Sequence, residues 1–301
     1  METRKLYYED PFQKGFATTV VSCDAVKGGY AVVLAETAFY PEGGGQPYDT
    51  GVLGEANVLE VHEKNGVITH LCDKPFEVGK SVSGKIDWAR RFDHMQQHSG
   101  EHICSGLICE RFHCDNVGFH MGADVVTIDF NADISWDELM EIEQLANLYI
   151  YEDHPIDIQF YRGAELDKVE YRSKKPLEGD VRIVSFPGAD CCACCGTHVV
   201  RSGQVGLVKF LSVQKFRDGV RIELLSGKRA HRYLSECWAQ DVRIAQALSV
   251  KPNASFAGVE RVLAELSALK QRCAKLEESV FAQTAAQYEG KGDVLSHVNL
   301  H

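Results

Sequence analysis

Two histidine-containing segments, almost a hundred residues apart, constrain the fold of this chain more than any other feature. His98-Ser-Gly-Glu-His102 places two imidazoles four residues apart, which puts them on one face of a helix. Cys194-Cys-Gly-Thr-His198 offers a thiolate and a third imidazole with the same separation. Zinc favours this mixture of nitrogen and sulfur ligands in tetrahedral geometry. The two motifs together predict a zinc site that joins a helix to a much later turn.

The spacing leaves the choice of ligands open. His94 precedes His98 by the same four residues, but each such step drifts by about 40° around a helix, so only two adjacent histidines share an ion well. Three further thiols are alternatives to Cys194 as the sulfur ligand: Cys191, Cys192 and Cys195. Four simultaneous protein ligands would close the site to water, so we expect three firm ligands and a looser His198.

The composition is typical of a cytoplasmic protein. The sequence contains no apolar run long enough to span a membrane, and its charged start, residues 1–10, lacks the apolar core of a signal peptide. Cysteines in a reducing compartment are more often thiols or metal ligands than disulfides. We therefore predict a cytoplasmic location and no membrane partner.

The formal net charge of −11 argues against broad, nonspecific binding to nucleic acids, and we expect no DNA partner. Two local stretches, 162–175 and 209–232, are nevertheless basic. Each is either a surface for RNA or a solvated face on an acidic protein.

Residues 1–88 predict a small β-barrel. Short segments rich in β-branched and aromatic residues alternate with glycine-containing turns, and a barrel is the natural way to close them. These segments are 16–21, 30–36, 58–63 and 67–71. The glycine-rich loop Gly43-Gly-Gly45 lacks the Lys-Ser/Thr ending of a P-loop. We interpret it as a loop that approaches the zinc site or the substrate closely.

Residues 89–233 predict an α+β domain that contains the zinc site. A helix over 87–112 carries both histidines of the first motif, and a capping box at Ser135 begins a second helix that runs through Ile150. Strands are expected at 125–130, 156–161, 181–186, 206–213 and 219–225. The fold class of the whole chain is therefore α+β.

Residues 234–301 predict a helical extension. Val262, Leu266, Leu269 and Leu276 alternate with charged residues as in an amphipathic or coiled-coil-like helix, which suggests a homodimer. Segment 293–298 resembles the opening of a strand with little chain left to pair with. We interpret the chain as cut short here, or its tail as disordered.

The two metal motifs resemble those of the alanyl-tRNA synthetase editing domain and its freestanding AlaX relatives. Segment 39–51 resembles the glycine-rich motif of the same family, and segments 117–120 and 199–206 fit it in the same order. The match covers nearly residues 1–230, and the helical tail resembles the extension of the long AlaX forms. Cys195 departs from the family pattern Cys-Gly-Gly-Thr-His, which has glycine at this position.

The resemblance implies a zinc-dependent deacylase that edits mischarged tRNA in trans. The family's metal positions match His98, His102, Cys194 and His198 and leave His94 outside. Ser99 stands where relatives often carry threonine, a hydroxyl associated with recognising the misplaced amino acid. The other predicted substrate-binding residues are Gly43, Gly44, Gly45, Gln46 and Thr197.

The predicted substrate is Ser-tRNA(Ala), followed by Gly-tRNA(Ala). A pocket made for alanine rejects smaller glycine or hydroxyl-bearing serine only weakly, so a second site must restore accuracy. Glu101 and His120 are the candidates for moving protons, although support of the ligands or plain packing explains either residue equally well.

Two other functions compete with this interpretation. His98-x-x-Glu101-His102 also satisfies the signature of inverted zinc peptidases, which would need a further acidic ligand and would leave Cys194 and His198 unused. The chain is alternatively a noncatalytic zinc module that only binds tRNA.

Overall fold

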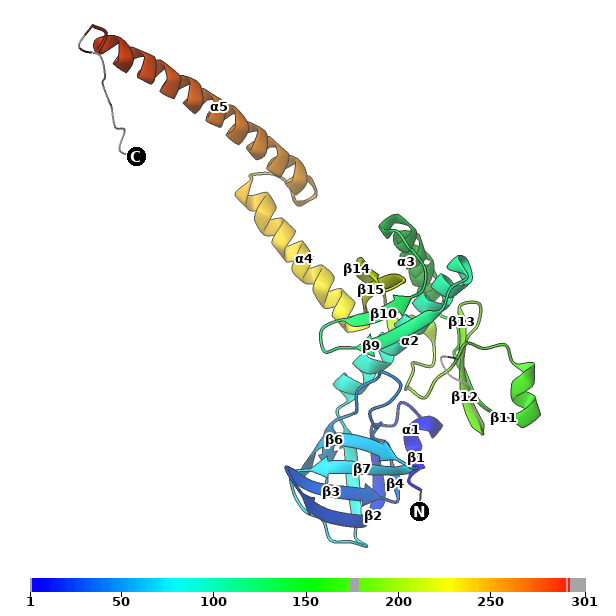
Figure 1. The fold of residues 1–301 in the computed structure, drawn as a ribbon. Helices are drawn as coiled ribbons and strands as arrows, with labels where there is room; N and C mark the ends of the chain where they lie inside the picture. The colour runs from blue at the N-terminus through cyan, green and yellow to red at the C-terminus, as the bar shows by residue number, and fades with distance from the viewer. Residues whose placement is uncertain (1, 174–178, 291, 293–301) are drawn as a thin grey trace. The chain divides into compact units, whose positions relative to one another are not determined.

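The computed structural model describes residues 2–173, 179–290 and 292, and its chain divides into two compact units, Met1–Arg232 and Tyr233–His301. The mixed α+β class is as predicted (Figure 1). Lys174, Lys175 and the strand expected at 293–298 lie outside the described residues. The predicted boundary at residues 88 and 89 stays a prediction. No described helix is long and apolar enough to cross a membrane.

Six antiparallel strands at the N-terminus pair in the order β2-β3-β7-β6-β5-β8 and close into a barrel. Their bounds are β2 Gly15–Val26, β3 Gly29–Leu34, β5 Gly51–Leu53, β6 Ala56–Lys64, β7 Val67–Cys72 and β8 Ser81–Ile86. Alternate residues such as Val32, Val61 and Ile68 fill the barrel interior. Strands β5 and β8 were not predicted, because β5 has three residues and β8 is rich in serine, glycine and lysine.

Three short elements accompany the barrel: β1 (Arg4–Lys5), α1 (Leu6–Glu9) and β4 (Glu36–Thr37). The loop after β4 contains the glycine-rich segment, and a buried ion pair between Asp49 and Arg91 attaches this loop to the next helix. The barrel and the metal motifs are thereby connected.

Helix α2 (Trp88–Phe112) carries the first histidine motif and is confirmed almost to the residue. Asp87 caps its N-terminus by accepting a hydrogen bond from the backbone N–H of Arg90. A four-stranded sheet packs against it in the order β14-β15-β10-β9. The sheet strands are β9 (Asn116–Met121), β10 (Val126–Phe130), β14 (Val208–Phe216) and β15 (Gly219–Ser226). The core of this region includes Met95, Ile103, Phe210 and Ile222.

Helix α3 (Trp136–Tyr151) begins at the predicted Ser135 capping box and packs against α2 and β14. A separate three-stranded sheet follows, in the order β11 (Asp157–Arg162), β12 (Asp180–Phe186) and β13 (Asp190–Ala193). A Cβ atom at Gly106 would lie 2.0 Å from the Ala189 carbonyl oxygen, so glycine at this position lets the start of β13 approach α2 closely. Two 3₁₀ helices, η1 (Gly163–Lys168) and η2 (Ser202–Val205), complete the unit.

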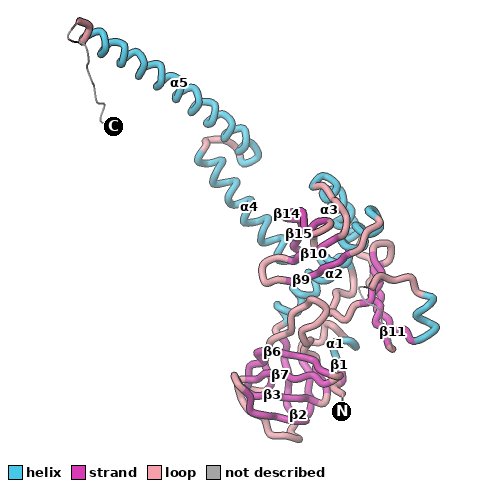
Figure 2. The backbone as a smooth tube through the Cα atoms, viewed as in Figure 1, coloured by secondary structure: helices cyan, strands magenta, loops and turns pink. Residues whose placement is uncertain are grey.

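Helix α4 (Gly227–Ala247) begins seven residues before the predicted helical region at 234, directly after β15, so the unit boundary falls inside this helix. The described part of the second unit is otherwise η3 (Pro252–Ala254) and the long α5 (Ser255–Gln287), with no strand (Figure 2). Gly258 packs against Leu248 within this unit. Much of the apolar surface of α5, including Leu269 and Leu276, is exposed.

Candidate metal centre

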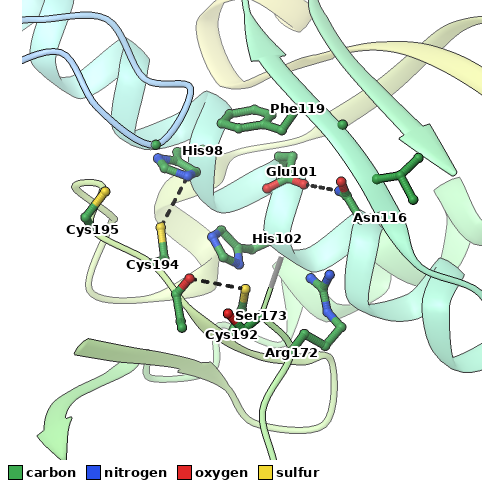
Figure 3. Close-up of a pocket in the computed structure, with 14 residues that line it drawn as sticks. His98, Glu101, His102, Asn116, Phe119, Arg172, Ser173, Cys192, Cys194 and Cys195 are labelled. Carbon is green, nitrogen blue, oxygen red and sulfur yellow. Dashed lines mark hydrogen bonds between the residues drawn. The ribbon is translucent and has the colours of Figure 1, made fainter. Parts of the chain in front are cut away.

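Four side chains from the two predicted motifs converge at one point. Ligand atoms of His98, His102, Cys194 and His198 all lie within 4.8 Å of one another. The Cys194 sulfur lies 3.4 Å from Nε2 of His98 and 3.3 Å from Nε2 of His198. Helix α2 supplies His98 and His102, and the segment after β13 supplies Cys194 (Figure 3). His198 follows four residues later in the same segment.

Each imidazole of this group is held by a hydrogen bond at Nδ1, which leaves Nε2 free to face the centre. Gln46 Oε1 contacts His98 Nδ1 at 2.8 Å, and Asp190 Oδ2 contacts His102 Nδ1 at 2.8 Å. The Ser99 hydroxyl is 3.4 Å from His198 Nδ1. Metal-binding histidines almost always have such a partner on the second nitrogen, because it fixes the tautomer and the ring orientation. The arrangement therefore fits a metal site.

The electrostatics favour a thiolate at Cys194. Burial raises the pKa of this thiol, but the charges of His98 and His198 and a hydrogen bond from His102 outweigh burial, so the pKa lies well below its usual value. Burial depresses the pKa of His198 well below its ordinary range. Hydrogen bonds from His102 and from Arg172 overcome burial and lower the pKa of Asp190, which keeps this carboxylate charged.

The turn that carries Cys194 is fixed by contacts from outside it. Arg182 donates hydrogen bonds to the carbonyl oxygens of Cys194 and Gly196 at 2.8 and 2.9 Å. A Cβ atom at Gly196 would lie 2.1 Å from Cε1 of His98, so only glycine permits this approach. The turn and the helix are thus packed as closely as their backbones allow.

A pocket of about 470 Å³ opens beside the centre. Gly44, His98, His102 and Cys194 line one part of it, and Glu101 lines another. Oε1 of Glu101 accepts hydrogen bonds from the hydroxyl of Ser105 and the amide of Asn116, at 2.7 and 2.8 Å. The other oxygen of Glu101 points away from Asn116, on the side of His98 (Figure 3). This carboxylate is therefore held in place while one oxygen stays available to a ligand.

Several predicted substrate-binding residues lie behind the centre and do not line the pocket. Ser99 is buried, and its hydroxyl accepts a hydrogen bond from the Val199 N–H at 3.1 Å besides contacting His198. Gln46 and Thr197 are also buried and hydrogen bond to each other at 2.8 Å. Ser99 and Gln46 thus contact His198 and His98 directly, and Thr197 contacts Gln46. Their predicted contact with substrate stays a prediction.

The three loop glycines differ in position. Only Gly44 lines the pocket, whereas Gly43 pairs with Gln46 in a tight turn. Gly45 permits close packing, since a Cβ atom there would lie 2.5 Å from the Phe119 ring. The loop therefore approaches the site, as the sequence indicated.

His120 is not brought to the centre. It lies on β9 next to Phe119, and successive strand residues point to opposite faces. Phe119 stacks on His98 with a centroid distance of 5.0 Å, while His120 is exposed. Its predicted role in proton transfer therefore has no support from its position.

The geometry narrows the choice of metal ligands among the thiols and histidines that the sequence left open. Among the described residues, neither Cys191 nor Cys195 belongs to a group that could hold a metal, whereas Cys192 forms a second such group with His102 and Asp190. His94 lies outside both groups. Cys194 is thus the sulfur nearest to the three imidazoles.

Sequence reasoning did not single out Asp190, Arg172, Asn116 or Phe119, which orient the ligands or line the pocket. Arg172 forms a two-point ion pair with Asp190, at 2.7 and 2.8 Å. An aspartate directly before the cysteine cluster was the one available signal, because ligating histidines often pair with carboxylates.

Comparison with known proteins gives two family matches. Residues 12–90 match the model described as tRNA synthetases class II (A), and residues 181–223 match the threonyl and alanyl tRNA synthetase second additional domain. The first covers the barrel and the glycine-rich loop, and the second contains Cys194 and His198. The fold and the site therefore define a protein of the synthetase editing-domain class.

Proteins that are similar over most of this chain identify its family more specifically. Alanyl-tRNA editing protein AlaX-L of Pyrococcus horikoshii is 31% identical over 92% of this chain and 71% of its own length. Alanyl-tRNA editing protein Aarsd1-A of Xenopus laevis is 29% identical over 97% of this chain and 75% of its own. Alanine–tRNA ligase of Pyrococcus abyssi is 36% identical over 98% of this chain, which spans about a third (34%) of that enzyme's length. The chain belongs to the AlaX family of alanyl-tRNA editing proteins.

Proposed function

We propose that this chain hydrolyses the ester bond of mischarged tRNA(Ala) in trans, with Ser-tRNA(Ala) as its first substrate and Gly-tRNA(Ala) as its second. The observation that carries the proposal is the convergence of His98, His102, Cys194 and His198 beside an open pocket. The printed names of its relatives, which are editing proteins and alanine–tRNA ligases, support the substrate class.

Zinc is the metal that we assign to the four side chains, because three imidazoles and one thiolate match its ligand preference. Zinc held by these side chains would polarise a carbonyl oxygen and lower the pKa of a bound water. All four donor atoms lie within 4.8 Å of one another, and the expected looser binding of His198 stays a prediction.

The protein's own contribution is to position the ester. Water adds to the ester carbonyl, the bond to the ribose oxygen breaks, and that oxygen leaves with a proton. Glu101 lies at the pocket wall with one oxygen fixed by Ser105 and Asn116. We assign to its other oxygen the attraction of the substrate's α-ammonium group or the transfer of the proton. Phe119, against His98, forms an apolar wall that excludes water from one side.

The direct test compares the ester half-lives of Ser-, Gly- and Ala-tRNA(Ala) with purified protein, with and without removal of zinc by a chelator. We expect rapid loss of Ser-tRNA(Ala), slower loss of Gly-tRNA(Ala), little effect on Ala-tRNA(Ala), and protection of all three after chelation. Full zinc content without deacylation of any charged tRNA would instead favour a noncatalytic tRNA-binding module. Cleavage of peptides in place of esters would favour the peptidase.

A homodimer through the C-terminal helices is also part of the proposal. Exposed apolar residues along α5, such as Leu269 and Leu276, support it because α5 leaves these side chains uncovered in the monomer described here.

A further inference from the structure

A second pocket, of about 410 Å³, lies beside α2 and is strongly basic. Its lining includes Arg90, Asp93, His94, Lys228, Arg229 and Arg232, all within the first unit. The single carboxylate, Asp93, is already bound by Arg229 through contacts of 2.6 to 3.0 Å. The other charged side chains of the lining are positive, so the pocket carries a net positive charge.

Two of these cations are positioned without an acidic partner among the described residues. Arg90 is anchored by its Nε donating to the Tyr48 carbonyl oxygen at 3.0 Å, and its guanidinium lies over the Tyr48 ring. Lys228 is exposed at the first turn of α4 and forms no ion pair within the described part of the chain. Both groups can therefore donate to an incoming anion.

His94 supplies an independent sign of a missing ligand. Its side chain is buried, with the residue only 3% exposed, and Nδ1 has no hydrogen-bond partner. Buried polar atoms in native proteins are nearly always paired, so the unpaired Nδ1 of a residue in the lining of this pocket is a sign of a further partner. Burial lowers the pKa of His94 to about 3, so the ring is neutral and its hydrogen bonding alone matters.

The pocket lies next to the metal centre. His94 is one helical turn, roughly 6 Å along the axis of α2, from His98. Pro47 lines the pocket and directly follows Gln46, whose side chain holds His98. An RNA whose terminal ester reaches the metal centre therefore has its preceding backbone phosphates in this neighbourhood.

We propose that this basic pocket binds a backbone phosphodiester near the acceptor end of the RNA. A phosphodiester offers several acceptor oxygens and one negative charge, which match the convergent donors of Arg90, His94 and Lys228. The inference rests on the proposed function for the identity of the RNA.

Binding of uncharged tRNA, measured at several salt concentrations, tests the proposal apart from catalysis. Lys228→Glu should weaken binding about tenfold at moderate salt and reduce the slope of log K against log salt by about one. Lys27→Glu, which makes the same charge change in the exposed β2–β3 turn, is the matched control and should have a much smaller effect. Equal effects of the two variants would overturn the proposal.

His94→Phe provides a second variant that keeps the ring and removes both nitrogens. It should weaken tRNA binding without lowering the thermal midpoint, because the buried Nδ1 that it removes has no partner in the free protein. Loss of stability with unchanged binding would mean a structural role and contradict the proposal. Inorganic phosphate should compete with tRNA in the wild type. If phosphate binds the pocket but tRNA binding is insensitive to both variants, the ligand is a free anion and the RNA assignment is wrong.

The outcomes separate this inference from the proposed function. If Lys228→Glu weakens tRNA binding and no charged tRNA is hydrolysed, the phosphate-binding pocket is supported and the proposed deacylase activity is wrong. If the Lys228→Glu variant hydrolyses Ser-tRNA(Ala) with unchanged KM, the deacylase activity is supported and the phosphate-binding pocket is wrong.

Discussion

At the scale of single residues, the site depends on side chains that never touch the pocket. Gln46, Asp190 and Ser99 each hold one imidazole by its Nδ1 atom, so they act on the ligands through orientation. The Ser99 hydroxyl lies between Val199 and His198, and the substrate contact that the family resemblance implies for it stays a prediction.

Ser99→Ala should weaken zinc binding by about ten- to a hundredfold, the usual effect of losing a partner of a ligating histidine. A competition titration with a zinc indicator measures the affinity. Ser99→Thr should keep it, because threonine retains the hydroxyl. If Ser99→Ala instead keeps the zinc affinity and alters the discrimination between Ser-tRNA(Ala) and Gly-tRNA(Ala), Ser99 takes part in substrate recognition.

His70, inside the barrel, makes stability depend on pH. Burial lowers its pKa to about 4 from 6.5, and the neutral ring bonds to Thr37 Oγ1 and the Val32 carbonyl oxygen, at 2.9 and 3.1 Å. The unfolded chain takes up the proton first as pH falls, so stability from this group is complete above pH 6.5 and is lost between 6.5 and 4. The loss is about 3 kcal/mol.

Urea unfolding of the zinc-free protein at pH 7 and pH 4.5 tests this dependence. The wild type should lose more free energy of unfolding over this range than His70→Gln, which has no titrating group there. Equal losses in the two proteins would show that His70 does not titrate as described.

At the scale of elements, α2 joins the barrel to the metal centre. Arg91 and Asp49 are both fully buried, and Arg91 also donates to the carbonyl oxygens of Pro11 and Ala38, at 3.1 and 2.6 Å. The same helix carries His98 and His102 about two and three turns further on. The buried pair therefore connects the glycine-rich loop rigidly to the helix that carries these histidines.

Arg91→Met should destabilise the protein by about 3–5 kcal/mol, because it leaves the buried Asp49 carboxylate without its partner. Arg111 lies on the same helix as Arg91 and forms an exposed ion pair with Glu141 of α3. Arg111→Met removes this pair and should lower the free energy of unfolding by less than about 1 kcal/mol. Chemical unfolding measures both. Similar losses in the two variants would mean that the buried pair contributes no more than a surface pair.

The elements also show how far the sequence predicts the structure. Long periodic segments were predictable: α2, α3 and the apolar strands β6 and β10 lie where their patterns indicated. β5 and β13 were missed, because strands of three and four residues carry too little pattern. The two candidate metal motifs could be recognised because helical spacing and ligand chemistry are local, and the family resemblance selected the four side chains that lie together in the structure. Gln46 and Asp190 were not recognised as their partners, because tertiary packing alone sets which side chain reaches each Nδ1.

At the scale of the whole molecule, the second unit is a pair of long helices with exposed apolar residues and no catalytic group of the site. If α5 mediates the proposed homodimer, Leu269→Glu combined with Leu276→Glu should convert a dimer into a monomer. Light scattering after size-exclusion chromatography measures the mass. Zinc content serves as the control and should be unchanged. A wild-type protein that is already monomeric at micromolar concentration would contradict the dimer.

We propose that one zinc ion, held by two distant segments, makes the chain a deacylase. A single titration tests it most directly: zinc is added to metal-free protein, and the rate of Ser-tRNA(Ala) hydrolysis is followed against bound zinc. We expect the rate to rise in proportion to bound zinc, to level off at one ion per chain, and to stay at background in Cys194→Ala. Full hydrolysis by the zinc-free protein, or a fully loaded protein without hydrolysis, would contradict it.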